Sequence, residues 1–243
     1  MLSDIQIKNK IQILTNKLNS RRFAEVIEET TLLLKKNKHQ VFFNMLCIAY
    51  QNTGKLDLAE SIMNEALKLN PNNPYFLNNM GITQHKKEAY NIAEKYFLKA
   101  LRIVPNYINV LNNFANLKRD LDQNDLAIEY YKKSIDINPN VVETLLNISI
   151  CYQSLGNYIE AKKNLRKLLE INPKFTTADR LLSSMIKYKD KQEGHFIEMM
   201  TKLNKLKLDE YQSANLFFAL GKANEDLMSY EDSFNFYKKG NDI

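Results

Sequence analysis

The chain contains few of the residues on which disulfide frameworks, metal sites and phosphate-binding loops depend. Its 243 residues include two cysteines, three histidines and six glycines. Two cysteines are too few for a disulfide framework, which favours a reducing compartment. No histidine or cysteine pair has metal-ligand spacing, and the glycines form neither a GxxxxGK[ST] nor a GxGxxG loop. We therefore expect no metal, no cofactor and no catalytic activity in this chain.

A long apolar segment is also missing. No uninterrupted apolar run approaches the roughly 18–20 residues that a membrane span requires. The N-terminal stretch MLSDIQIKNKIQIL carries Asp4 and other polar residues where a signal peptide would need an apolar core. Since 44% of the residues are hydrophobic, the chain has enough apolar surface to fold. These features predict a cytoplasmic protein without a membrane partner.

The excess of positive charge is spread thinly along the chain. The formal net charge is +6, but the lysines occur as separate doublets, and most have an acidic residue nearby, as Glu129 precedes Lys132 and Lys133. Such a distribution is typical of solvated helix faces. It argues against a nucleic-acid partner, which would favour a continuous basic stripe.

A fixed interval of 34 residues organises most of the sequence. Pro71, Pro105, Pro139 and Pro173 follow one another at this distance, each after a helix-like segment. A period of this size is the mark of a helical-repeat protein. With the proline at position 32, successive repeats begin at Gln40, Pro74, Ile108 and Val142.

Two helices are predicted within each repeat. Apolar residues at positions 4, 7, 8 and 11 share one helix face, and positions 20, 24 and 27 share another. Position 8 is small and position 24 is large, whereas position 20 is alanine in all four repeats (Ala59, Ala93, Ala127 and Ala161). Small residues at positions 8 and 20 allow the two helices of a repeat to approach closely.

This pattern resembles the tetratricopeptide repeat, a helix-turn-helix unit. The resemblance implies an all-α, right-handed superhelical solenoid of about six to seven antiparallel helix pairs that acts as a scaffold for protein or peptide binding. It covers nearly the whole chain as a single solenoid. The expected units are about 4–39 (divergent), 40–73, 74–107, 108–141, 142–175, 176–213 (irregular) and 214–243 (truncated).

The C-terminal part carries a second resemblance. The stretches ADRLLSSMIKYKD (178–190) and LFFALGKANEDLMSYEDSFNFYKKGN (216–241) are similar to bacterial proteins in which such repeats lead into a sulfotransferase domain. This implies that the chain is the substrate-recruiting region of a modifying enzyme and that a catalytic domain follows in a longer parent protein. The alternatives are a stand-alone assembly scaffold and, less favoured by the scattered charge, a basic nucleic-acid-binding solenoid.

Asparagines recur on the first helix of the repeats. Asn79, Asn113 and Asn147 occupy position 6 at the 34-residue interval, although asparagine is a poor helix former. They lie off the packing face and are expected to face a concave groove. The segment LNNFANLKRD is similar to repeats of O-linked N-acetylglucosamine transferases, a family in which an asparagine ladder binds substrate backbone. The alternative is that these amides link neighbouring repeats.

The predicted peptide-binding surface consists of polar residues at positions 5, 6, 9 and 12 of the first helices. They are Asn44, Asn78, Asn79, His85, Asn112, Asn113, Asn116, Arg119, Asn147 and Gln153. A further contact is expected at the C-terminal unit, where Phe234 and Tyr237 lack a following repeat that would cover them. Because solenoids usually need a polar cap at such an end, we expect self-association there.

Overall fold

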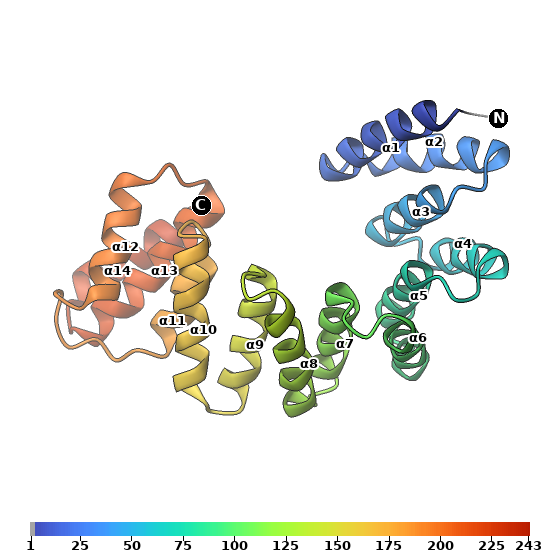
Figure 1. Cartoon of the computed structure of the whole chain (residues 1–243). Coiled ribbons are helices and arrows are strands. Elements are labelled where there is room, and N and C mark those ends of the chain that lie inside the picture. The colour runs from blue at the N-terminus through green and yellow to red at the C-terminus, as the bar shows by residue number, and fades with distance from the viewer. Residues whose placement is uncertain (1–2) are drawn as a thin grey trace. The chain divides into compact units, whose positions relative to one another are not determined.

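The computed structural model describes residues 3–243, and this part of the chain forms fourteen α-helices and no strand (Figure 1). The predicted all-α fold class is confirmed. The structure comprises two compact units, one ending at Leu121 and the other beginning at Asp122. The division falls at the turn between α7 and α8, inside the predicted repeat 108–141. Each unit is described separately.

The helices of the first unit follow the predicted pairs. They are α1 (Asp4–Asn19), α2 (Phe23–Lys36), α3 (Gln40–Asn52), α4 (Leu56–Leu69), α5 (Pro74–Lys86), α6 (Tyr90–Ile103) and α7 (Ile108–Asp120). Each helix packs against the next, and α1, α3, α5 and α7 also pack against one another in order. The first helices of successive repeats thus form one continuous layer.

The second unit contains the remaining helices. They are α8 (Asn124–Ile137), α9 (Val142–Ser154), α10 (Tyr158–Ile171), α11 (Thr176–Ser184), α12 (Gly194–Lys205), α13 (Glu210–Asp226) and α14 (Tyr230–Asn241). The pairs α9–α10 and α13–α14 pack closely, whereas α12 packs mainly on α13. Helix α13 begins four residues before the predicted boundary at 214, because Asp209 and Gln212 form a capping box at its N-terminus.

The turn between the two helices of a repeat has the same backbone form each time. Gly54, Glu88, Asp122 and Gly156, which all occupy position 15, have φ angles of 71°, 60°, 57° and 72°. This left-handed conformation costs glycine little and other residues more. Its recurrence at 34-residue spacing shows that the repeat fixes the turn even where glycine is absent.

The small and large positions of the repeat meet as predicted. Ala59, Ala93, Ala127 and Ala161 are fully buried. In the repeat 74–107, the small residue is Gly81, and a Cβ atom placed there would lie 2.5 Å from the ring of Phe97 at position 24. Close helix approach at these positions therefore depends on the absence of a side chain.

Candidate functional site

Asparagines at positions 5 and 6 pair between neighbouring repeats of the first unit. The Nδ2 group of Asn79 on α5 donates to Oδ1 of Asn44 on α3 at 2.9 Å. One repeat later, Nδ2 of Asn113 on α7 donates to Oδ1 of Asn78 on α5, also at 2.9 Å. The same amide–amide bond is thus formed twice, each time from position 6 to position 5 of the preceding repeat. In this part of the chain the amides do link neighbouring repeats.

The pairs are less exposed than a groove surface would be. Asn78 and Asn79 are each 7% exposed, whereas Asn44 and Asn113 are half-buried. The expectation that position 5 and 6 side chains lie outside the packed interior is therefore wrong for Asn78 and Asn79. The reason is that α5 packs against α3 on one side and against α7 on the other. Asn79 lies against α3 and Asn78 lies against α7.

A second polar contact reinforces the α3–α5 junction. Gln51, at position 12 of α3, donates from Nε2 to the backbone carbonyl of Asn79 at 3.0 Å and to Oγ1 of Thr83 at 2.9 Å. The Cys47 thiol lies 3.8 Å from the same hydroxyl, and burial raises the pKa of this thiol to about 12. Because a thiolate is the reactive form of cysteine, Cys47 is an inert packing residue here.

Two of the other predicted residues of the first unit, His85 and Arg119, lie near the C-terminal ends of α5 and α7. His85 Nε2 is 3.1 Å from Oδ2 of Asp120, and burial lowers the His85 pKa. Arg119 pairs with the same carboxylate at 3.0 Å. Asn112 and Asn116 lie half-buried on α7. His85 and Arg119 therefore converge on Asp120.

Two predicted residues belong to the second unit. Asn147 is half-buried on α9. Gln153, at the end of α9, donates to Oγ of Ser184 on α11 at 3.4 Å. The predicted set is therefore divided between the two units, and the amide pairs Asn44–Asn79 and Asn78–Asn113 belong to the first.

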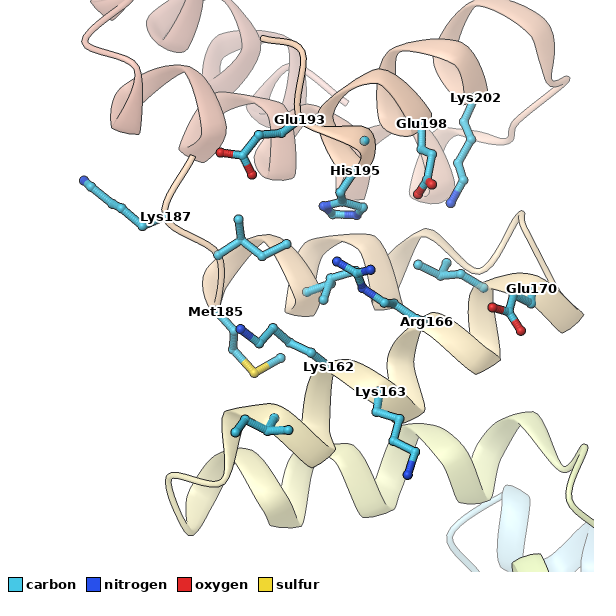
Figure 2. A pocket seen from close by; sticks show the side chains of 15 residues that line it. Lys162, Lys163, Arg166, Glu170, Met185, Lys187, Glu193, His195, Glu198 and Lys202 are labelled. Carbon is cyan, nitrogen blue, oxygen red and sulfur yellow. The ribbon is translucent and has the colours of Figure 1, made fainter. Parts of the chain in front are cut away.

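A pocket in the second unit was not predicted from the sequence. It has a volume of about 1010 Å³ and lies between α10, the end of α11, and α12 (Figure 2). One side carries Lys162 and Arg166 from α10, and the other carries Glu193 and Glu198 at the start of α12. The sequence signal that could have found it is the stretched segment YKDKQEGH, which interrupts the 34-residue period.

A buried polar network lies beside this pocket. Asp179 on α11 is fully buried, and its two carboxylate oxygens accept from Nζ of Lys202 at 2.7 and 2.9 Å. His195 Nε2 lies 3.2 Å from the same carboxylate, and His195 Nδ1 lies 2.6 Å from the Tyr188 hydroxyl. Burial raises the Tyr188 pKa above its usual range. This network connects α12 to α11 through side chains.

The described part of the chain contains neither a metal-binding cluster nor a membrane-spanning helix. Within residues 3–243, no group of three or more histidine, cysteine, aspartate or glutamate side chains could hold a metal ion. None of the helices in this range is long and apolar enough to cross a membrane. Neither Cys47 nor Cys151 forms a disulfide within the described residues.

Comparison with known proteins identifies the repeats. Models of the tetratricopeptide repeat match residues 40–73 and 106–174. These two segments therefore contain tetratricopeptide repeats, as their spacing predicted. Such repeats are in general protein-interaction scaffolds and are typically not catalytic. A search of curated proteins found no significant match.

Solved structures show the same fold at low sequence identity. A tetratricopeptide repeat protein from Parabacteroides merdae is 17% identical, with a TM-score of 0.62 over 97% of this chain and 92% of that one. TTC0263 from Thermus thermophilus is 16% identical, with a TM-score of 0.64 over 73% of this chain and 97% of that one. For pilF of Pseudomonas aeruginosa, the values are 14%, 0.63, 82% and 95%. These likenesses concern the fold alone, and the relation to sulfotransferase proteins stays a prediction.

Proposed function

We propose that this chain is a non-catalytic scaffold that binds an extended polypeptide along the surface of α3, α5 and α7. The observation that carries the proposal is the repeated amide pair, Asn79 with Asn44 and Asn113 with Asn78. A peptide backbone presents a regular series of N–H and C=O groups. A surface that presents the same polar pair once per repeat can therefore match it regardless of the peptide's side chains.

Each pair keeps hydrogen-bonding capacity after it has formed. An asparagine amide has two N–H donors and an oxygen with two lone pairs. In the Asn44–Asn79 pair, one donor of Asn79 and one lone pair of Asn44 are used. The N–H donors of the half-buried Asn44 complement the C=O groups of a peptide, whereas the buried Asn79 contributes by holding Asn44 in place.

The link also reduces the cost of ordering these side chains. Immobilising a flexible side chain on binding costs on the order of 0.5–1.5 kcal/mol. Asn79 and Asn44 are already held by each other and by the contacts of α3 with α5. Linking repeats and binding a peptide are therefore compatible roles for the same amides, and a test has to separate them.

Aspartate substitutions separate the two roles. Asn44→Asp keeps the oxygen that accepts from Asn79 but removes the N–H donors offered to a peptide. Asn79→Asp removes the donor of the pair and places a carboxylate against the Asn44 oxygen. We expect Asn44→Asp to weaken peptide binding several-fold while the free energy of unfolding changes by less than about 1 kcal/mol. Asn79→Asp should lower both binding and stability.

A peptide selected from a random phage-displayed library against the full chain is a suitable probe. Its Kd for wild type and both variants is measured by fluorescence anisotropy, beside urea unfolding followed by circular dichroism. Lys95→Glu, an exposed change on α6, controls for altered charge. Equal affinity of the selected peptides for wild type and both asparagine variants would show that they bind elsewhere.

We further propose that this scaffold recruits substrates for a sulfotransferase-type enzyme in the cytoplasm. The support is the resemblance of residues 178–190 and 216–241 to such proteins, and two cysteines without a disulfide among the described residues fit a reducing compartment. The genomic sequence after codon 243 tests the idea. A reading frame that continues into a strand–loop–helix phosphate site supports it, whereas an immediate stop codon supports a stand-alone assembly scaffold.

We also propose self-association through the C-terminal repeat. Tyr230 and Phe234 on α14 are each 67% exposed, and Met228 before this helix is 75% exposed. An apolar surface of this kind favours burial against another molecule. We expect sedimentation velocity to show a concentration-dependent oligomer that Phe234→Glu abolishes. The control Leu58→Glu, on the exposed face of α4, should leave it unchanged, and a wild-type monomer at every concentration would contradict the proposal.

A further inference from the structure

The pocket of the second unit exists because one repeat departs from the regular form. The first helices α3, α5, α7 and α9 each have 13 residues, but α11 has only 9. No helix is formed between Met185 and Glu193, and α12 then packs mainly on α13. Space that a regular helix pair would fill with its own side chains is left open between α10 and α12.

Unlike charges line the two sides of this space. Figure 2 shows the side chains of α10 and those of α12 on opposite sides of the pocket. Within the described residues, Lys162 and Arg166 on α10 form no ion pair or hydrogen bond, and neither does Glu198 on α12. Glu193 accepts a hydrogen bond from the backbone N–H of Lys189. The α10 side also carries Glu170, but its three basic residues outnumber this carboxylate, and on the α12 side the Lys202 charge is compensated by Asp179. The α10 wall is thus mainly positive and the α12 wall mainly negative.

The other basic residues of the pocket are already neutralised. Lys202 is bound by both oxygens of the buried Asp179. Lys187 pairs with Asp226 at 3.0 Å. Lys163 lies 3.8 Å from Glu160. A simple anion therefore gains less from this pocket than a ligand that carries both signs of charge.

Apolar residues also line the pocket. Leu182, Met185 and Ile186 come from α11 and the segment after it, and Leu169 and Ile159 come from α10. These residues favour an apolar side chain of the ligand, whereas the charged residues of α10 and α12 favour charged groups on either side of it. An amphipathic helix with an apolar stripe and oppositely charged flanks combines these features.

We propose that this pocket is a docking site for an amphipathic helix of a partner protein, with acidic residues facing α10 and basic residues facing α12. Its volume of about 1010 Å³ is enough for about two turns of a helix, given a helix diameter of about 10 Å and a pitch of about 5.4 Å. The site belongs to the second unit and does not depend on the asparagine surface of the first.

A synthetic helical peptide tests this proposal on the full chain. The peptide has a leucine stripe that contains a single tryptophan, glutamates along one flank and lysines along the other. Because the protein contains no tryptophan, a blue shift of the peptide fluorescence reports burial directly. We expect the mixed-charge peptide to bind at least ten-fold more tightly than versions with glutamate on both flanks or lysine on both flanks.

Charge reversal on each wall assigns the binding to this pocket. The double variant Lys162→Glu/Arg166→Glu should prefer the peptide with two lysine flanks, and Glu193→Lys/Glu198→Lys should prefer the one with two glutamate flanks. Lys95→Glu on α6 should bind as wild type does, and circular dichroism verifies that all variants are folded. The proposal is overturned by no fluorescence shift at about 1 mM protein, by equal affinity for the three peptides, or by binding that neither reversal alters.

Discussion

Replacing Asp179 by alanine should lower the free energy of unfolding by about 3–5 kcal/mol, the range measured when one partner of a buried ion pair is removed. Asp179 is fully buried and accepts from Lys202 through both oxygens. Its removal leaves the Lys202 ammonium, whose side chain is 11% exposed, without a counter-ion. His195 loses the same partner. Urea unfolding followed by circular dichroism at 222 nm measures the loss.

A more exposed carboxylate with similar partners is the matched control. Asp226 also binds two lysines, Lys187 and Lys222, but its side chain is 10% exposed and that of Lys187 is 77% exposed. In the Asp226→Ala variant, water can therefore solvate the lysine that loses its partner. The loss in the free energy of unfolding should be clearly smaller than for Asp179→Ala. The double variant Asp179→Ala/Lys202→Met should recover part of the stability, because no unpaired lysine charge remains. If Asp179→Ala costs no more than Asp226→Ala, the network does not hold α12 to α11.

The regular part of the fold could be predicted because one physical rule is repeated. Each repeat needs small residues where its helices meet and large residues beside them, so the pattern returns every 34 residues. The predicted repeat starts Gln40, Pro74, Ile108 and Val142 are the first residues of α3, α5, α7 and α9. A pattern that recurs in four aligned repeats locates the start of a helix more reliably than a single occurrence does.

The sequence predicted where Asn78 and Asn79 lie along α5, but it did not predict that they are buried. Spacing along one helix showed that Asn78 and Asn79 lie off the face that packs within the repeat. It could not show that α3 and α7 cover them from either side, because that depends on how successive repeats stack. The pairing of position 6 with position 5 of the preceding repeat is likewise a contact between repeats, which periodicity alone does not determine.

The interrupted period indicates an irregular repeat between residues 176 and 213, but it does not predict the buried network beside the pocket. His195 has no histidine or cysteine neighbour in the sequence, so it gave no sign of a site. Its partners are Asp179, 16 residues earlier, and Tyr188, 7 residues earlier. Helical periodicity does not relate these residues, since Asp179 lies on α11, Tyr188 lies in the irregular segment and His195 lies on α12. Only the folded chain brings the three side chains together.

Gly81→Ala should lower the stability of the wild-type protein but raise that of the Phe97→Ala variant, because positions 8 and 24 of the repeat are in contact. Phe97→Ala should cost about 3–5 kcal/mol, because it removes a fully buried ring. In wild type, Gly81→Ala should also destabilise, since the new Cβ would lie 2.5 Å from that ring. Overpacking typically costs about 1–3 kcal/mol, which exceeds the gain of up to about 1 kcal/mol from alanine's higher helix propensity.

In the Phe97→Ala background, the same Gly81→Ala change should instead stabilise by up to about 1 kcal/mol, because the ring is gone and the propensity gain remains. Gly221→Ala is the matched control from the last repeat. Its Cβ would lie 2.7 Å from Tyr237, but Tyr237 is only half-buried and can turn away, so the cost should be smaller than at Gly81. Urea unfolding of the four proteins of the cycle gives the coupling energy between the two positions. Stabilisation by Gly81→Ala in both backgrounds would mean that the Phe97 ring does not fill the space beside Gly81, and the register that places position 24 against position 8 would then be wrong.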